Sequence, residues 1–484
     1  MGLPATEALD VYGSIVFAMS FVATFTFIAD LGFGMAHMKR VSEGYDLGKC
    51  IGTYTTVRLI LTGIMVLTIF CSIWAWKYLL GGSFSYAINE TVVYMFILYY
   101  VLFNIANIAI ITYDAKVETA KSQLSALAEP LVRTPFIIVI GISGLIPNEL
   151  KVYYIAFAYL LGAAGLLIVA MLMFKNYPLK KPDKETFRHY VVFAFPMVVI
   201  SIISVIVMYA DKLIIGYFWS SVEVGQYAGV QAIILNIYFI SVAVGYVLFP
   251  TMSSHHIKKD ITKIRELTYK AERYISMIVT PIAFFIIAFA EEILQLVNAA
   301  LIPAGNAFRI LAVAVIFSSI GTPNGYQVLG LGRTDITIKG NVAQTSIFLI
   351  FCLILVPNQL LGIRTMSLGI TGAAVAYLIG VICGVFFCKY CSWKLTGTKL
   401  QSCLFIHIIA GCSMAAILCY IDIYLLNVVR WYEIGIMLVI GIIIYTGLLH
   451  LLREFNRTEL FFLLDIINLK KLQIYLSNEI KKRE

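Results

Sequence analysis

Thirteen apolar stretches of about 20 residues or more follow one another along this chain of 484 residues. A membrane-spanning helix needs about 20 predominantly apolar residues, so each stretch is long enough to cross a bilayer. Charged residues make up only 13% of the chain, against about 25% in soluble proteins, which excludes a large catalytic domain outside the membrane. The stretches do not alternate with a period of two, as the strands of a membrane β-barrel do. We therefore predict an all-α polytopic membrane protein with 13 transmembrane helices, at 11–33, 50–76, 91–113, 121–146, 151–174, 190–217, 226–252, 273–297, 306–330, 338–357, 367–391, 401–426 and 431–453.

Lysine and arginine residues predict the orientation of these helices, because cytoplasmic connections carry an excess of them. Alternate connections and the C-terminal tail hold 28 of the 36 basic residues, whereas the connections on the other side hold four. The remaining four, Arg58, Arg133, Lys212 and Arg309, lie within spans or at their ends. We expect a multi-pass protein of the cytoplasmic (plasma) membrane with a cytoplasmic C-terminus. The basic excess follows the topology, so no nucleic acid is expected as a partner.

Two short patterns recur along the chain. Tyr12-Gly13 resembles Tyr227-Ala228, 215 residues later, and the segment 158–162 resembles 376–380, 218 residues later. Two similar lobes with a weak internal repeat are typical of transporter folds. A full span, 190–217, precedes the second copy, whereas only eleven residues precede Tyr12. We therefore expect that the first helix of a 14-helix pattern is missing, through a misplaced start or a truncation.

These observations divide the chain into five expected parts. They are an N-terminal helical lobe at 1–174, a basic cytoplasmic linker at 175–188, a C-terminal helical lobe at 189–400, two additional spans at 401–453 and a cytoplasmic tail at 454–484. The tail and the stretch 255–272 both place apolar residues at helical spacing among basic ones. We expect both to form amphipathic helices on the inner leaflet, in contact with anionic lipids. Solvated connectors are the alternative.

Four basic residues in or at the ends of apolar helices are the candidate binding residues. A charge at mid-membrane costs about 2.5–3.5 kcal/mol and usually faces a cavity or a partner. We expect Arg58, Arg133, Lys212 and Arg309 to line such a cavity. Snorkelling towards the inner headgroups is the alternative for Arg58, and an interfacial anchor is the alternative for Arg309.

Three acidic residues are expected to support these cations. Glu129 lies four residues before Arg133, which is the favourable order for a helical ion pair. Asp211 and Lys212 are adjacent, so we expect that they cannot face each other and that at least one points inward. Asp30 is expected to bind a basic neighbour such as Lys39 or to cap the turn that follows it.

Enzyme signatures are absent from the sequence. It has no glycine-rich nucleotide loop, no H-E-x-x-H motif and no nucleophile elbow. The six histidines form no ligand set visible from their spacing, and Cys388-Lys-Tyr-Cys391 ends an apolar helix far from any βαβ pattern. We expect no enzymatic activity, no catalytic residues, no cofactor and no metal site.

Several motifs resemble those of one transporter family. The segment Ala29-Asp30-Leu31-Gly32-Phe33, followed by Lys39-Arg40, is similar to the helix exit of Wzx-type polysaccharide flippases, in the MOP (MATE-like) exporter superfamily. Further segments that carry the resemblance are 209–216 (YADKLIIG), 223–228 (EVGQYA), 330–333 (GLGR) and 369–376 (GITGAAVA). The resemblance covers about residues 10 to 450.

The resemblance implies a fold of two pseudo-symmetric helical lobes around a central cationic cavity. It implies a flippase that moves a polyprenyl- or dolichyl-(di)phosphate-linked oligosaccharide across the membrane by alternating access, for the assembly of surface polysaccharide such as the O-antigen of lipopolysaccharide. By that analogy Arg58, Arg133, Lys212 and Arg309 would bind the phosphate. The implied partners are the lipid-linked oligosaccharide, anionic inner-leaflet lipids and other membrane proteins of polysaccharide assembly.

Two other functions are open to a chain of this kind. A cation-coupled multidrug antiporter of the same superfamily generally keeps acidic residues inside its first lobe, whereas basic residues are in excess here. A membrane polysaccharide polymerase or ligase places arginines in a large external loop, whereas the external connections here are short.

Overall fold

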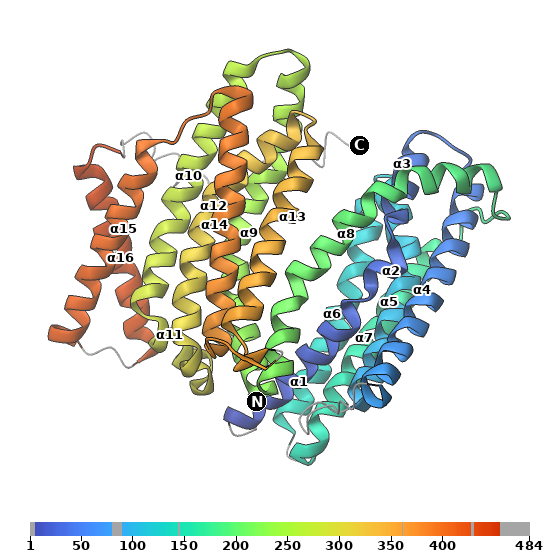
Figure 1. Cartoon of the computed structure of the whole chain (residues 1–484), viewed down its shortest axis with the longest axis horizontal. Helices are drawn as coiled ribbons and strands as arrows, with labels where there is room; N and C mark the ends of the chain where they lie inside the picture. The colour runs from blue at the N-terminus through green and yellow to red at the C-terminus, as the bar shows by residue number, and fades with distance from the viewer. Residues whose placement is uncertain (1–4, 80–89, 144–145, 361, 427–429, 455–484) are drawn as a thin grey trace. The chain divides into compact units, whose positions relative to one another are not determined.

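A computed structural model describes residues 5–79, 90–143, 146–360, 362–426 and 430–454 (Figure 1). The helices of the first half are α1 (Ala5–Ala23), α2 (Thr26–Asp30), α3 (Phe33–Ser42), α4 (Leu47–Tyr78), α5 (Glu90–Ala115), α6 (Thr119–Ile142), α7 (Asn148–Phe174), α8 (Lys184–Phe218) and α9 (Ser221–Ile257). Those that follow are α10 (Ile261–Ala288), α11 (Ala290–Val297), the 3-10 helix η1 (Ala299–Ala304), α12 (Gly305–Gly330), α13 (Thr334–Leu355), α14 (Gly369–Thr396), α15 (Ser402–Ile421), the π-helix η2 (Asp422–Leu426) and α16 (Trp431–Leu451). Strands β1 (Gln359–Leu360) and β2 (Ile363–Arg364) form a small antiparallel pair between α13 and α14.

Within these ranges, 13 helical segments are long and apolar enough to cross a membrane. The predicted all-α polytopic fold with 13 spans is therefore confirmed. The expected tail helix lies outside the described residues from 455 onward. The five-part division of the chain stays a prediction.

The described helices form two compact units. Unit 1 comprises Met1–Ala232, Asn298–Ala307 and Ile338–Gly384, and unit 2 comprises Ile233–Val297, Phe308–Thr337 and Val385–Glu484, each in its described parts.

In unit 1, α7 packs against both α5 and α6. Small residues allow the approach: Ala106 and Ala109 of α5 and Ala170 of α7 are fully buried in one apolar cluster. The same cluster holds Tyr113, whose hydroxyl donates to the Ala170 carbonyl at 2.8 Å. A helix interface built from small residues is typical of membrane bundles, where packing rather than water exclusion drives association.

The predicted first span at 11–33 is divided in the structure. Helix α1 ends at Ala23, and the chain turns at Leu31 and Gly32, whose φ angles of 43° and 79° are left-handed. Glycine adopts this conformation without steric cost, so Gly32 permits the turn that starts α3 in a new direction. A Cβ at Gly32 would also meet Met197 and Ala194 of α8 at 2.6–2.8 Å.

Glycines also set the distance between α1 and its neighbours in unit 1. A Cβ built on Gly13 would lie 1.7 Å from the carbonyl oxygen of Ser221, and one on Gly225 would lie 2.5 Å from the carbonyl oxygen of Leu9. Side chains cannot occupy these positions, so the backbones of α1 and the start of α9 lie in direct contact. The Ser221 hydroxyl also donates to Asp10.

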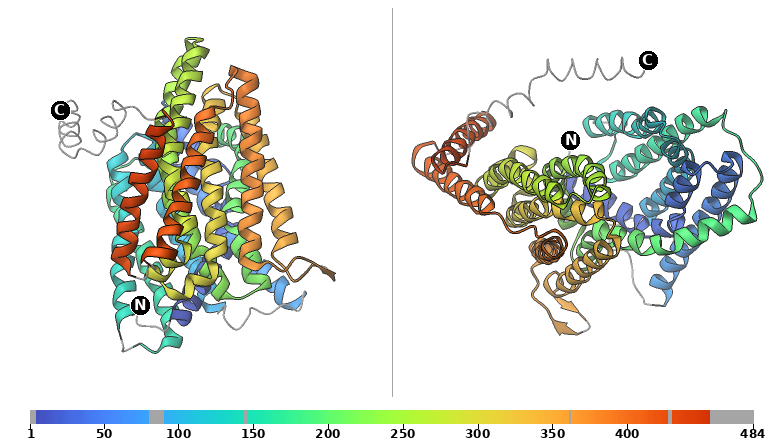
Figure 2. Two further views of the ribbon diagram at one scale, coloured as in Figure 1. Left: turned by 90° about the vertical axis from the view of Figure 1, so that its left-hand side faces the viewer. Right: turned by 90° about the horizontal axis from the view of Figure 1, so that it is seen from above.

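In unit 2, α10 packs against α15, which in turn packs against α16 (Figure 2). The shared core includes Phe285 and Phe289, Met414 and Leu418 of α15, and Met437 of α16. A Cβ at Gly411 would meet Phe284 at 2.5 Å, so this glycine lets α15 approach α10.

The stretch 255–272 differs from its predicted form. Its second part is the start of α10, and its apolar face contacts protein: Ile264 and Ala271 lie in one buried cluster with Leu248 and Met252 of α9. Helical periodicity predicts the apolar face correctly. The expectation that this face contacts the lipid surface is wrong for Ile264 and Ala271, because other protein side chains cover them. Contact with anionic lipids stays a prediction, which now depends on the tail 454–484 and on the remaining residues of the stretch 255–272.

Candidate functional site

Arg58, in α4, is buried and held by two other helices of unit 1. Its Nη1 atom forms an ion pair with Asp30 at the end of α2, and its Nη2 atom donates to Oδ1 of Asn104 in α5 at 2.8 Å. Arg58 is only 5% exposed. The side chain therefore points into the unit, and the snorkelling alternative is wrong.

Asp30 has the capping role predicted for it. Its Oδ2 accepts from the Gly32 N–H and its Oδ1 from the Gly34 N–H, both at 3.2 Å. Its basic partner is Arg58 and not the expected Lys39. The Nζ atom of Lys39 lies 3.9 Å from Oε1 of Glu43 instead. One carboxylate thus fixes the chain turn after α2 and compensates the charge of Arg58.

A buried histidine that the sequence did not single out lies in α3. The ring of His37 stacks on that of Tyr54 at 4.5 Å, and its two nitrogens lie 2.8 Å from the Tyr190 hydroxyl and 3.0 Å from the Thr112 hydroxyl. The Thr112 hydroxyl donates to the Ile108 carbonyl, so its oxygen accepts from Nε2–H. In that tautomer Nδ1 accepts from the Tyr190 hydroxyl at 2.8 Å, a shorter contact than the 3.4 Å from this hydroxyl to the Cys50 carbonyl. Helix α3 lies outside the candidate spans, so a search for charges inside spans does not reach His37. The sequence signal for it is a histidine beside an apolar helix face.

Arg133 forms the expected ion pair within α6 and also lies against an aromatic ring. Its Nη1 atom is 3.3 Å from Oε1 of Glu129, which confirms the i,i+4 pairing. Its guanidinium carbon lies 4.4 Å from the centre of the Tyr159 ring of α7, a cation–π geometry. The Arg133 side chain remains 26% exposed and that of Glu129 10%.

Tyr159 belongs to a group of aromatic side chains in edge-to-face contact in unit 1, which we call the aromatic layer. The ring of Tyr159 contacts those of Phe96 and Tyr99 at 5.5 and 6.0 Å, and Tyr99 contacts Tyr100 at 5.1 Å. Tyrosines combine an apolar face with a polar hydroxyl. Phe96, Tyr99 and Tyr100 are at most 9% exposed, so the layer is buried aromatic packing beside the cation of Arg133.

Lys212 and Asp211 pair directly, contrary to our expectation. The Nζ atom of Lys212 lies 3.0 Å from Oδ1 of Asp211 and donates to the Met208 carbonyl at 2.8 Å. The long lysine side chain bends back along α8, so neighbouring Cβ directions do not prevent the contact. Asp211 is fully buried, and its Oδ2 accepts from Gln231 of α9 at 3.0 Å.

Arg309 lies in unit 2, at the start of α12. Its Nη1 atom is 3.2 Å from Oε1 of Glu291 in α11, and its Nε donates to the Ile287 carbonyl at 3.3 Å. Each of the four predicted cations is therefore paired with a carboxylate, three of them in unit 1 on α4, α6 and α8.

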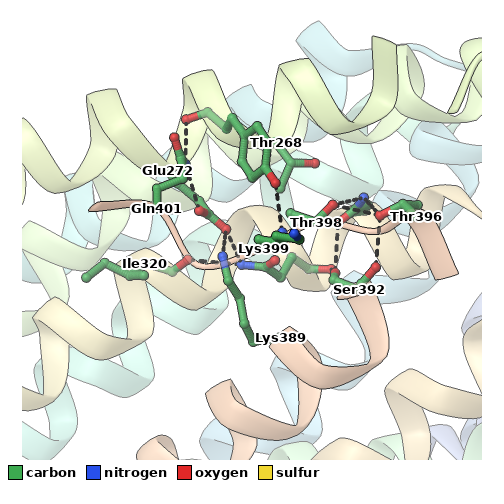
Figure 3. Close-up of polar contacts among 12 residues, drawn as sticks. Thr268, Glu272, Ile320, Lys389, Ser392, Thr396, Thr398, Lys399 and Gln401 are labelled. Carbon is green, nitrogen blue, oxygen red and sulfur yellow. Dashed lines mark hydrogen bonds and ion pairs between the residues drawn. The ribbon is translucent and has the colours of Figure 1, made fainter. Parts of the chain in front are cut away.

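Unit 2 contains a polar network that the sequence did not indicate (Figure 3). Glu272 of α10 is completely buried; it pairs with Lys389 of α14, and it accepts from Asn324 of α12 at 2.7 Å and from Gln401 at 2.9 Å. Glu272 is the last residue of the stretch 255–272 that we expect on the inner leaflet, and Lys389 lies near the end of the predicted span 367–391. The signal that could have found them is Lys389 itself, a charge flanked by Cys388 and Tyr390 in an apolar helix.

A second set of hydrogen bonds lies beside this network. Gln327 of α12 donates to the hydroxyls of Thr396 and Thr398 at 2.7 and 3.1 Å, and it accepts from Ser392 at 2.7 Å. All four residues are buried or nearly so. Together the two sets join α10, α12, α14 and the segment that leads into α15.

The fold and the paired charges define a polytopic helical membrane protein with charged residues buried among its helices. The chain matches the family described as polysaccharide biosynthesis protein over residues 9–300. It belongs to this family, and the family-level resemblance predicted from its motifs is confirmed.

The chain is also similar to two proteins from Methanocaldococcus jannaschii and Haloferax volcanii. An uncharacterised membrane protein of Methanocaldococcus jannaschii is 29% identical over 246 residues, which cover 48% of this chain and 46% of the relative. A protein of Haloferax volcanii named "Probable low-salt glycan biosynthesis flippase Agl15" is 24% identical over 349 residues, 72% of this chain and 69% of the relative. The chain thus spans about half the length of the first relative and about two thirds of the second.

Among solved structures, the lipid II flippase MurJ in an inward closed conformation has a TM-score of 0.69 with this chain. The comparison covers 93% of this chain and 97% of that one at 12% identity. At this identity the likeness shows that the two share a fold.

Proposed function

We propose that this protein is a flippase for a lipid-linked oligosaccharide. Its substrate class is an oligosaccharide attached through a phosphate or diphosphate to a polyprenyl or dolichyl chain, and the membrane is the cytoplasmic membrane. The transport cycle is alternating access, with no covalent step on the substrate. Membership of a polysaccharide biosynthesis family and a relative named as a flippase support this proposal.

The observation that carries the proposal is the environment of Arg133. Of the three predicted cations in unit 1, it has the most exposed side chain, at 26% against 6% for Arg58 and 11% for Lys212. Among the described residues, the buried Nε atoms of both Arg133 and Arg58 have no hydrogen-bond partner, so exposure of the side chain is what distinguishes Arg133. Arginine binds phosphate through charge-assisted and often bidentate hydrogen bonds. Arg133 therefore presents a partly exposed guanidinium, beside the ring of Tyr159, to which a phosphate can bind.

Glu129 explains how the site is stable without substrate. A buried charge that loses its only partner is strongly destabilising, whereas a paired one is tolerated. Glu129 compensates Arg133 in the empty protein, and an incoming phosphate then competes with that carboxylate for the guanidinium. Binding is thus an exchange of one anionic partner for another.

The experiment is flipping of a fluorescent lipid-linked oligosaccharide in proteoliposomes that contain the full chain. Arg133→Ala is expected to lower the flipping rate at least tenfold, since a charge-assisted hydrogen bond contributes about 1.5–3 kcal/mol. Arg133→Lys keeps the charge but loses the bidentate geometry, so we expect an intermediate rate. Arg333→Ala is the matched control, because Arg333 pairs with Asp335 at an exposed position.

Equal rates for Arg133→Ala and Arg333→Ala would contradict the role of Arg133. If the wild-type chain moves no lipid-linked oligosaccharide but does move a cationic dye against a proton or sodium gradient, the protein is an antiporter and not a flippase.

A further inference from the structure

A hollow of about 350 Å³ lies in unit 2 where α14 ends. Its wall includes Phe386, Lys389, Tyr390 and Trp393 of α14, and Lys399 and Leu400 of the segment that follows. This hollow belongs neither to the Arg133 site nor to any other part of the proposed transport function. Its walls combine large apolar surfaces with two lysines.

The apolar wall is an exposed stripe on one face of α14. Phe386, Tyr390 and Trp393 lie four and three residues apart, so they share a helix face, and they are 64%, 56% and 52% exposed. Tyr390 and Trp393 have ring centres 6.0 Å apart. Tyrosine and tryptophan are enriched at the membrane–water interface, where such rings sit at headgroup level. The stripe therefore fits a lipid that lies along α14.

The polar wall is held in a fixed position. Gly397, with a φ of 74°, turns the chain at the end of α14, and the backbone N–H of Lys399 donates to the Tyr269 hydroxyl at 2.7 Å. The buried Thr398 between them accepts from Gln327 at 3.1 Å. The return of the chain brings Lys399 and Leu400 to the same hollow as the aromatic stripe.

The two lysines differ in how they are held. Lys389 is paired with the buried Glu272, and its side chain is 14% exposed, whereas Lys399 is an exposed residue. Figure 3 shows both beside the Glu272 network. An anion in the hollow would meet the full charge of Lys399 and the partly compensated charge of Lys389. Charge complementarity therefore favours an anionic headgroup over a zwitterionic one.

We propose that this hollow binds one anionic phospholipid of the inner leaflet, with its phosphate at Lys399 and Lys389 and its acyl chains along Phe386, Tyr390 and Trp393. The distribution of basic residues predicts that this end of α14, with Lys389, Lys394 and Lys399, faces the cytoplasm. The inner leaflet is the leaflet that carries anionic lipids and attracts lysines close to its surface.

The first test is native mass spectrometry of the full chain, titrated with phosphatidylglycerol or phosphatidylcholine. We expect retention of phosphatidylglycerol in preference to phosphatidylcholine. Lys399→Ala should weaken phosphatidylglycerol binding about fivefold, the effect of one lysine near an anionic surface. Lys394→Ala is the matched control, because this lysine lies at the same end of α14 but outside the hollow. Lys389 is not substituted, since its loss would leave Glu272 buried without its cation.

A second measurement locates the acyl chains. Phosphatidylglycerol with brominated chains should quench tryptophan fluorescence with a saturable component that Trp393→Phe removes. Trp431→Phe, a change at an exposed tryptophan of α16, should retain that component.

Three outcomes would overturn the proposal. They are equal binding of phosphatidylcholine, an equal loss of phosphatidylglycerol binding in the Lys394 and Lys399 variants, and complete displacement of the phospholipid from this hollow by a polyprenyl phosphate. The last outcome would assign the hollow to the carrier lipid. None of them depends on whether the chain flips an oligosaccharide.

Discussion

The ion pairs of Arg58, Lys212 and Arg133 in unit 1 differ in how far the cation is accessible to a ligand. Arg58 is enclosed by Asp30 and Asn104, and its pairing also fixes the turn after α2. Lys212 is held by Asp211 and by a backbone carbonyl of its own helix. Among these three cations, Arg133 alone has a side chain that is about one quarter exposed and a guanidinium that lies over an aromatic ring, that of Tyr159. This difference supports the proposal that Arg58 and Lys212 shape the unit and that Arg133 contacts the ligand.

His37 predicts a pH dependence of stability. Burial lowers the pKa of His37 from its usual 6.5 to about 3. The unfolded chain then binds a proton below pH 6.5 that the folded protein does not, so stability is retained above pH 6.5 and declines as the pH falls from there. The largest slope for one such group is about 1.4 kcal/mol per pH unit. We expect the melting temperature to fall between pH 7 and pH 5, and His37→Gln to flatten this fall.

His256→Gln is the control for this measurement, because His256 is exposed. Melting in detergent, followed by size-exclusion chromatography, gives the profile of each variant. Parallel pH profiles for wild type and His37→Gln would contradict the assigned role of His37.

At the scale of helices, glycine contacts determine how closely α1 approaches its neighbours in unit 1. Gly13→Ala would place a Cβ 1.7 Å from the backbone oxygen of Ser221, and a backbone atom cannot move aside as a flexible side chain can. We expect a loss of stability of about 1–3 kcal/mol or more, as for overpacking in a core. The melting temperature and the yield of monodisperse protein measure this loss.

Gly63→Ala is the matched control for that change. Gly63 lies within α4 and has open space around its Cβ position. Alanine has the higher helix propensity, so this variant should be as stable as wild type or slightly more stable. A Gly13→Ala protein as stable as Gly63→Ala would show that α1 is not packed as described.

The number of spans was predictable because a long apolar run has few alternatives in a membrane. The pair of Arg133 with Glu129 was also predictable, since both lie on one helix at fixed spacing. The partner of Arg58 was not, because Asp30 lies 28 residues earlier on another helix and only the fold brings them together. Likewise, the apolar face of α10 was visible in the sequence, but periodicity cannot tell whether lipid or protein covers it. Glu272 and Lys389 were missed for a similar reason, since they meet through three-dimensional packing alone.

At the scale of the whole molecule, the distribution of basic residues predicts the orientation in the membrane. In a chain whose nine native cysteines are replaced by serine, we expect Arg430→Cys to react with a membrane-impermeant maleimide in intact cells. Lys394→Cys should react only after the membrane is permeabilised. Both positions are exposed, so access to the reagent is limited by the membrane. The opposite labelling pattern would reverse the predicted topology and place the C-terminus outside.

The pairing of the four predicted cations with carboxylates also has an electrical consequence. A pair that moves together carries no net charge through the transmembrane field, so rearranging the empty protein does almost no work against the membrane potential. An oligosaccharide on a diphosphate is itself an anion, and outward movement from a negative interior releases about 2.3 kcal/mol for each elementary charge and each 100 mV. The membrane potential would therefore drive the loaded protein outward, and the empty protein would return by thermal motion. The cycle would then have a direction although no net charge of the protein crosses the membrane.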